Sequence, residues 1–328
     1  MKKKIDIKCC PGTLAPGHDT YSVTTLRRLF NGRKVHHQLP YVSPSTTTDS
    51  DDQYLHNRNR ISISGVQEKF SLVLHKNKLS LAQDDDQATY ILKPRPHYGK
   101  NLDHMAANEH LTMQIARQVY DIDTAENAMI FFTDGGAAYI TKRFDVKPDG
   151  SKWASEDFAS LAQRTPATHG ENFKYEGCYL DVFDTMKKFL SIYQVEAEKL
   201  LKLIVFNYLF SNGDAHFKNF SLIENTMGDS RLSPAYDLLN TRLHVDDSDF
   251  ALSDGLLPRR TIKRQIRHQF LTLADMAGLR QTQTDRVMAK MMKSYPKIKS
   301  MIDSSYLPTK LKRNYWQAYQ GKYKQLNK

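Results

Sequence analysis

Residues 212–221 read NGDAHFKNFS, and this short stretch decides the fold that we predict. It follows an apolar segment of helical periodicity (195–210) and leads into a strand-like piece (219–224), which makes it a tight polar loop. The Asp214 carboxylate can orient a hydroxyl and accept its proton, and the Asn219 oxygen can hold a magnesium ion. Their spacing favours phosphoryl transfer. The alternative is an ordinary turn rich in Asp and Asn.

Two further runs fit the same chemistry. In SPAYDLLN (233–240), Asp237 is the predicted second metal ligand, because kinases place such an aspartate one hairpin beyond the catalytic loop. In YILKPRP (90–96), Lys93 lies in an apolar strand, where an ammonium is costly unless it finds an anion. Kinases pair this lysine with a helix glutamate, and Glu109 is the candidate. The alternatives are a turn or helix-cap aspartate and a strand-end lysine that reaches solvent.

The front of the chain is rich in predicted strands. Alternating apolar and polar residues indicate two hairpins, at 61–82 and 128–144, and a further short strand at 90–96. Helical spacing of apolar residues indicates one helix at 101–120. A small sheet packed on a helix follows from this order, whereas most of residues 1–60 predict no clear element.

The rear of the chain is predominantly helical. Helical periodicity is present at 181–193 and 195–210 and again from residue 260 onward. Two short strand-like pieces interrupt it and flank the turn NTMGDS (225–230). We therefore predict two domains, a β-rich N-terminal lobe at 1–153 and a helical C-terminal lobe at 154–328.

The composition is that of an ordinary globular protein. The 328 residues are 40% hydrophobic and 25% charged, which excludes disorder as the main state and collagen-like classes. Three cysteines cannot form a disulfide framework, so we expect a reducing compartment. The basic start lacks the apolar core of a signal peptide, and no stretch is long enough to span a membrane. We expect a cytoplasmic protein.

Positive charge is concentrated in the rear of the chain. Residues 257–328 contain 17 basic and 3 acidic residues, a net charge of +14, whereas the whole chain carries +11 and the remainder therefore −3. Such a region favours an acidic partner or a nucleic acid. The alternative is a solvated helical face.

The run ISISGVQEKF (61–70) lies between two predicted strands, where a phosphate-covering loop would lie. Gly65 is its single glycine, so it does not match the GxGxxG loop of a generic protein kinase. Lys69 could add positive charge near phosphates. Ser62 and Ser64 share a face if the segment is extended, which makes both hydroxyls candidate phosphate acceptors.

Together these runs resemble the HipA-like serine/threonine kinases of bacterial toxin–antitoxin systems. The resemblance extends in family order from Ser62 to Asn240 through SISGVQEKFSLVL, YILKP, NEHLTMQIA, YITKRFDV, SEDFASL, NGDAHFKNFSLI and LSPAYDLL. The short segment ahead of the phosphate loop resembles the compact HipT type, in which a separate polypeptide supplies the N-terminal subdomain. The fold implied is α+β and two-lobed, protein-kinase-like and related to the phosphatidylinositol kinases.

The resemblance also implies roles for individual residues. Asp214 would be the catalytic base, while Asn219 and Asp237 would hold Mg²⁺. Ser62 aligns with the serine that HipA kinases autophosphorylate, and Ser64 is the second serine of the HipT-type pair. The residues implied to contact ATP belong to the phosphate loop, the strand lysine, the adenine hinge and the catalytic region: Gly65, Val66, Gln67, Lys69, Lys93, Glu156, Phe158, His216, Lys218 and Tyr236.

The function implied is a growth-inhibiting protein kinase. Its substrate would be a serine of an aminoacyl-tRNA synthetase, the tryptophanyl enzyme for the HipT type. Its partners would be antitoxins, including a separate N-subdomain-like protein and a DNA-binding protein through which DNA is contacted indirectly. Three alternatives stay open: an inactive kinase-fold binding module, a DNA-binding regulator, and a metal-dependent phosphohydrolase using Asp214 and His216.

Overall fold

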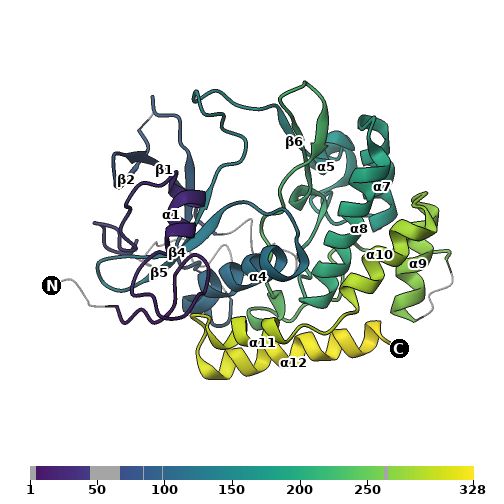
Figure 1. Ribbon diagram of the computed structural model, residues 1–328. Coiled ribbons are helices and arrows are strands. Elements are labelled where there is room, and N and C mark those ends of the chain that lie inside the picture. Colours follow the sequence, from purple (N-terminus) through teal and green to yellow (C-terminus); the bar gives the residue numbers. More distant parts are fainter. Residues whose placement is uncertain (1–4, 45–66, 84, 98, 262–264) are drawn as a thin grey trace.

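The computed structural model describes residues 5–44, 67–83, 85–97, 99–261 and 265–328. Figure 1 shows strands gathered in the N-terminal part and helices in the C-terminal part, with α4 (Met105–Tyr120) between them. The last two helices, α11 (Pro296–Asp303) and α12 (Thr309–Leu326), run beneath both parts. Within these described residues, none of the helices is both long and apolar enough to cross a membrane.

An antiparallel sheet of five strands forms the N-terminal part, in the order β2-β1-β3-β5-β4. Its strands are β1 (Phe70–His75), β2 (Lys78–Leu81), β3 (Tyr90–Lys93), β4 (Asn127–Phe131) and β5 (Ala137–Lys142). Of the two predicted hairpins, the one at 61–82 turns at HKNK (75–78) and the one at 128–144 turns at DGG (134–136). Both hairpins are confirmed, and so is the strand of Lys93. The predicted helix at 101–120 is present as the short 3₁₀ helix η1 (Leu102–His104) followed by α4.

The sheet is covered on both faces. Ala128 and Ile130 of β4 pack in one apolar cluster with Leu29 and Phe30, whereas the alternate residue Met129 joins the larger cluster around α4. This alternation is the period of two expected for a strand buried on both sides. The face that holds Ala128 and Ile130 is covered by a helix that precedes the sheet in the chain.

That covering helix, α1 (Val23–Phe30), was missed by the sequence analysis. Ser22 caps it by accepting a hydrogen bond from the Thr25 amide, and Asn31 ends it in the left-handed conformation. The helix has only eight residues, and its apolar residues follow a helical period that the sequence analysis overlooked. Its stability therefore derives from Leu29 and Phe30, which are buried against the sheet.

The C-terminal part consists of helices around a small second sheet. This antiparallel sheet has the order β6-β7-β8, from β6 (Ser155–Asp157), β7 (Ser221–Glu224) and β8 (Ser230–Leu232). Its helices are α5 (Phe158–Leu161), α6 (Pro166–His169), α7 (Tyr179–Phe189), α8 (Tyr193–Leu209), η2 (Phe217–Asn219), η3 (Thr241–Leu243), α9 (Ile266–Met276), α10 (Gln281–Met291), α11 and α12. The two predicted helices at 181–210 and the helical rear end are confirmed.

Helix α4 is buried along nearly its whole length, and its polar residues each have a partner inside the protein. Asn108 donates from Nδ2 to the Asn240 carbonyl at 2.8 Å, and its Oδ1 accepts from the Asn240 amide at 3.1 Å. Thr112 Oγ1 lies 2.8 Å from the Tyr315 hydroxyl of α12. His110 Nε2 lies 3.1 Å from the Gly12 carbonyl oxygen. Burial lowers the pKa of His110 to about 4, although the carbonyl contact opposes this shift.

We expect His110 to make the protein less stable in mild acid. The unfolded chain protonates this histidine near pH ~6.5, whereas the native protein does so only near pH 4. The free energy of unfolding should therefore fall, by up to about 1.4 kcal/mol per pH unit from this group, as the pH drops below ~6.5. Urea unfolding of His110→Gln should show a shallower pH dependence by that amount. His268→Gln, at an exposed position, is the control, and an unchanged slope in His110→Gln would contradict the expectation.

Candidate active site

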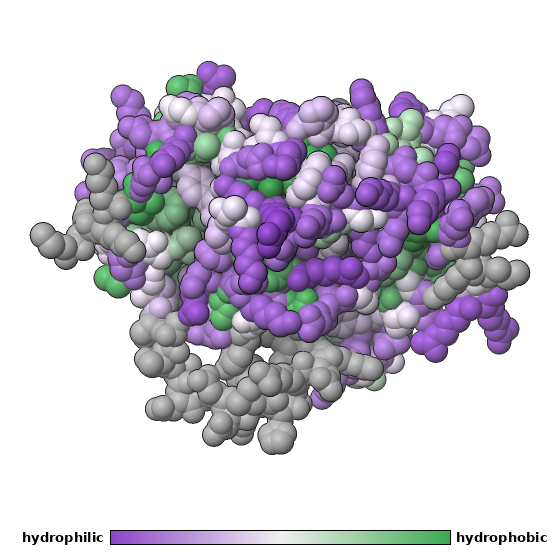
Figure 2. All heavy atoms as spheres, turned by 90° about the horizontal axis from the view of Figure 1, so that it is seen from below, coloured by the Kyte–Doolittle hydropathy of each residue, from purple (hydrophilic) through white to green (hydrophobic). Residues whose placement is uncertain are grey.

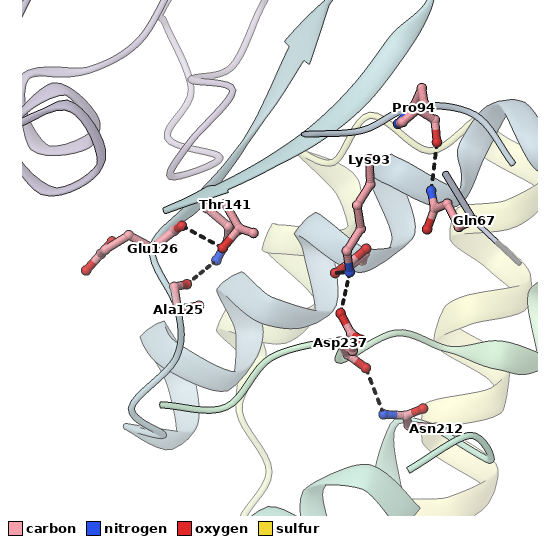
Figure 3. A network of polar contacts seen from close by, with 10 residues as sticks. Gln67, Lys93, Pro94, Ala125, Glu126, Thr141, Asn212 and Asp237 are labelled. Carbon is pink, nitrogen blue, oxygen red and sulfur yellow. Dashed lines mark hydrogen bonds and ion pairs between the residues drawn. The ribbon is translucent and has the colours of Figure 1, made fainter. Parts of the chain in front are cut away.

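Lys93 lies at the centre of a buried ionic cluster between the two parts of the molecule. It ends β3, and its Nζ donates to Glu109 Oε1 of α4 at 2.7 Å and to Asp237 Oδ1 (Figure 3). Lys93 is 5% and Glu109 3% exposed. The Nζ also lies 5.3 Å from the centre of the Tyr139 ring, on the neighbouring strand β5. The pairing of Lys93 and Glu109 that the sequence predicted is therefore present.

Lys93 and Asp237 hold each other ionised in this cluster. Burial alone would lower the pKa of Lys93, but the carboxylates of Asp237 and Glu109 outweigh burial and raise it. Burial would raise the pKa of Asp237, yet the positive charge of Lys93 holds it below its ordinary value. For Glu109, burial outweighs the attraction of Lys93, and its pKa is raised. Asp237 is therefore the more firmly ionised of the two carboxylates.

Asp214 lies on the loop that follows α8. It is 8% exposed, and its Oδ1 accepts a hydrogen bond from the Tyr175 hydroxyl at 2.8 Å. Gly213 precedes it where the chain passes close to its neighbours, since a Cβ there would lie 2.6 Å from the Ser248 carbonyl oxygen. The loop therefore needs glycine at this position to bring the Asp214 carboxylate to its place.

Asn219 and Asp237 are both tied to this loop. Asn219 Oδ1 accepts from the His216 amide at 3.1 Å, which fixes the direction of its side chain. Asn212 donates from Nδ2 to the Asp237 carbonyl oxygen at 3.3 Å, as Figure 3 shows. Asp237 has a left-handed backbone with φ 54°, a conformation that costs free energy for a residue other than glycine and is common at functional sites.

His216 lies in the same loop with a buried ring. Among the residues that the structure describes, neither ring nitrogen has a hydrogen-bond partner. The ring stands edge-on to Tyr175, with 5.0 Å between the ring centres. Burial, followed by the positive charge of Lys174, lowers the pKa of His216 to about 3. The imidazole is therefore neutral at pH 7 and keeps two polar atoms for a ligand.

Lys174 and Tyr175 belong to the site although the sequence analysis did not select them. Lys174 is part-buried, and burial lowers its pKa while the negative charge of Asp214 opposes the shift. Tyr175 donates to Asp214 directly. Both lie in a segment with no helix or strand between α6 and α7, so no periodicity or spacing pointed to them.

The two residues implied to contact the adenine, Glu156 and Phe158, lie in β6 and at the start of α5. Glu156 is exposed and pairs with Leu222 of β7. Phe158 is fully buried, its amide donates to the Phe220 carbonyl at 3.0 Å, and its carbonyl accepts from Ala162 at 3.0 Å. The roles of Glu156 and Phe158 as adenine contacts stay predictions.

The edge of β6 that faces away from β7 is formed by every second residue of the strand. The Ala154 carbonyl accepts from the Glu224 amide of β7, and the Phe158 amide donates to the carbonyl of Phe220, which directly precedes β7. Because backbone groups alternate along a strand, those of Ser155 and Asp157 point away from β7. The backbone groups of Ser155 and Asp157 therefore form the outer edge of β6.

Lys218 and Tyr236 link β6 to the segment that follows Asp214. Lys218 donates from Nζ to Asp157 Oδ2 at 2.9 Å. The Tyr236 hydroxyl donates to the Lys218 carbonyl at 2.9 Å and lies 2.6 Å from Ser221 Oγ. Both residues therefore lie next to the predicted nucleotide positions and have structural partners there.

The predicted phosphate loop is described only at its end. Ser62, Ser64, Gly65 and Val66 lie outside the described residues. Gln67 is buried, and its Nε2 donates to the Pro94 carbonyl at 2.7 Å (Figure 3). Lys69 is exposed, and its charge helps to lower the pKa of both Asp237 and Lys174. Lys69 therefore lies near both of these residues.

The basic residues of the C-terminal region spread over the outer surface of the last helices. Figure 2 shows the side on which α11 and α12 lie, and hydrophilic side chains cover most of it. Lys322 does not contribute to this surface, since it is buried beside the Tyr208 ring and pairs with Asp249. Exposed members are Arg267, Arg280, Arg286, Lys293, Lys297, Lys299, Lys310, Arg313 and Lys324.

Comparison with protein families gives the relationship directly. The model of the HipA-like C-terminal domain family matches residues 61–298, which is more than half of the chain. The chain belongs to this family. The match contains the ionic cluster of Lys93, the loop of Asp214 and Asn219, and Asp237.

Individual HipA-like relatives are distant. A candidate kinase of Haemophilus influenzae is 24% identical over 227 residues, covering 67% of this chain and 63% of that protein. The serine/threonine-protein kinase toxin HipA of Shewanella oneidensis is 24% identical over 201 residues, covering 57% of this chain and 45% of that protein. The chain thus spans less than two thirds of the length of these relatives.

The fold is that of HipA. The solved structure of the Shewanella oneidensis MR-1 toxin–antitoxin system, HipA with HipB and operator DNA, matches with a TM-score of 0.61. The match covers 82% of this chain and 64% of that chain at 20% identity. The predicted two-lobed, HipA-like kinase fold is confirmed.

Removing the lysine from the ionic cluster should destabilise the protein strongly. Lys93→Met leaves the Glu109 and Asp237 carboxylates buried without a cation, a change that costs about 3–5 kcal/mol. Lys100→Met is the matched control, because Lys100 pairs with Asp246 at an exposed position and such pairs contribute about 0–1 kcal/mol. Urea unfolding measures both variants.

The difference should depend on pH with a defined sign. Lys93 holds the pKa of Asp237 below its ordinary value of 3.8, so the pair stabilises the native protein above that pH. Lys93→Met should therefore cost most near neutral pH and less as the carboxylates take up protons in acid. A cost near that of Lys100→Met, or one independent of pH, would contradict this account of the cluster.

Proposed function

We propose that this protein is an ATP-dependent serine/threonine protein kinase. The observation that supports this proposal is the contact of Lys93 with Glu109 and Asp237, with Asp237 held against the Asp214 loop through Asn212. One strand, one helix and two loops far apart in sequence thereby supply the phosphate-binding, metal-binding and base groups of a phosphotransferase. The kinase names of the relatives support the same class.

The donor set suits ATP with Mg²⁺. Asn219 and Asp237 offer an amide and a carboxylate oxygen, which are hard ligands of the kind that magnesium prefers. Among the described residues, no group of three His, Cys, Asp or Glu side chains forms a metal cage. Magnesium in kinases keeps waters and phosphate oxygens as ligands, so two protein oxygens suffice. Bound magnesium would neutralise charge on the transferring phosphoryl group.

The chain's own groups divide the remaining work. Lys93 and Lys69 offer positive charge to the phosphates, and the Ser155–Asp157 backbone edge offers donors and acceptors to an adenine. Asp214 orients the substrate hydroxyl and accepts its proton, while the Tyr175 hydroxyl holds the carboxylate in direction. The His216 ring is neutral, so it can lie beside an anionic ligand but adds no positive charge there. Each role remains our proposal for these positions.

Replacing the base tests the activity. Asp214→Asn keeps the hydrogen-bonding shape but cannot accept the proton, so transfer from γ-labelled ATP should fall by a factor of ~10²–10⁴. Asp184→Asn, at an exposed position on α7, should leave transfer unchanged. A wild type that binds ATP but transfers nothing would favour the inactive binding module. Phosphate release without transfer to protein would favour the phosphohydrolase.

The substrate and partners follow from the resemblance to HipA-like toxins. We propose a serine of an aminoacyl-tRNA synthetase as the acceptor, the tryptophanyl enzyme if the chain is of the compact HipT type. The exposed basic surface of α9 to α12 would suit a substrate that arrives with bound tRNA. Antitoxin partners, one of them DNA-binding, are proposed on the same basis. Mass spectrometry of a bacterial lysate incubated with the protein and Mg-ATP would identify the phosphorylated serine.

We further propose that Ser62 and Ser64 are autophosphorylated and that this silences the enzyme. A phosphate adds about −1.5 to −2 charge at pH 7, which would repel the nucleotide phosphates. Preincubation with Mg-ATP should weaken ATP binding by the wild type and by Ser71→Ala, a control on β1. The double variant Ser62→Ala, Ser64→Ala should keep its affinity. An equal loss of affinity in the double variant would place the regulatory site elsewhere.

A further inference from the structure

A second cationic pocket lies outside the proposed nucleotide cleft. It has a volume of about 120 Å³ and opens between the turn after α4, one face of α8 and the end of β8. This volume holds several water molecules and thus one tetrahedral oxyanion. Its basic lining residues are Lys199 and Lys202, three positions apart on α8, and Arg231 on β8.

Arg231 points to an anion most directly. Its Nε is buried and has no hydrogen-bond partner among the described residues. Within the part of the chain that the structure describes, its guanidinium forms no salt bridge. A buried donor on a charged group is costly unless a ligand or water satisfies it. The planar guanidinium offers two parallel N–H donors, which match the oxygens of a phosphoryl group.

Lys199 and Lys202 add positive charge to the same pocket. Lys202 donates from Nζ to the Asp121 carbonyl oxygen at 2.8 Å rather than to a carboxylate. Its pKa is lowered by burial and next by the positive charge of Lys290, so positive charge is crowded here. Lys199 is partly neutralised by Glu196, whose other oxygen accepts from the Leu232 amide.

The acidic residues at the rim of the pocket, Asp121 and Asp123, form no salt bridge with Arg231 in the described part of the chain. The Asp121 carboxylate is exposed and pairs with Lys290. Asp123 is exposed to solvent. A small anion could therefore approach Arg231 and Lys202 without displacing a carboxylate from either of them.

We propose that this pocket binds a tetrahedral oxyanion, either free phosphate or the phosphate of a monoester. The pocket adjoins the segment that leads to Asp237. Ala235 lines it, the Ala235 amide donates to the Asp123 carbonyl at 2.8 Å, and the Ala125 amide donates to the Ala235 carbonyl at 2.9 Å. The proposal does not depend on the kinase activity, because it concerns residues outside the cleft.

Calorimetric titration with inorganic phosphate tests the site, with a saturating ATP analogue present so that the cleft is occupied. Arg231→Gln should weaken phosphate binding by at least ~10-fold, as expected for the loss of a hydrogen bond to a charged group. Lys202→Gln should weaken it as well, which keeps the test valid if Arg231→Gln does not fold. Arg27→Gln, at an exposed position on α1, is the matched control and should bind as the wild type does.

Two further arms identify the ligand and exclude simple screening. Methyl phosphate that binds as tightly as inorganic phosphate would assign the pocket to monoesters, and binding of the inorganic ion alone would assign it to free phosphate. Both results support the site. Equal heats from chloride at the same ionic strength, or equal affinities in Arg231→Gln, Lys202→Gln and the wild type, would overturn it. Crystals soaked with phosphate should show the ion against Arg231, and density only in the cleft would also overturn it.

Discussion

The enclosure of one ammonium group with two carboxylates is the constraint on which the site depends. Lys93 is 5% exposed, so its charge would be prohibitively costly without Glu109 and Asp237. Satisfying it requires a strand, helix α4 and the segment beyond β8 to meet at one point. The two parts of the molecule are therefore held in register by an electrostatic requirement as well as by apolar packing.

The parts of the fold that the sequence analysis predicted are those encoded by local patterns. The two hairpins show alternation of two, the long helices show helical spacing, and turn residues such as the DGG run mark their ends. The Lys93–Glu109 pair was also predictable, because a lysine in an apolar strand demands a counter-charge and the following helix offers one. The family resemblance then supplied the order of the remaining motifs.

The parts that escaped prediction depend on tertiary contacts. Helix α1 is stabilised by the sheet it covers, and Tyr175 meets Asp214 only because the irregular chain before α7 folds back onto the loop. The backbone groups of Ser155 and Asp157 face away from β7 because strand register decides which groups of β6 point outward. No single-sequence pattern fixes that register. Asp237 contacts the loop of Asp214 through Asn212, and the roles of both aspartates stay proposals.

The contact between α4 and α12 has a consequence for how the protein is made. Thr112 meets Tyr315 across 203 positions of the chain, and Tyr120 lies near Tyr319. A growing polypeptide leaves the ribosome from its N-terminus, and contacts so distant in sequence form late. The helix that holds Glu109 therefore cannot reach its final surroundings until α12 has been translated. A nascent chain halted before that point would lack part of the packing that supports the ionic cluster of Lys93.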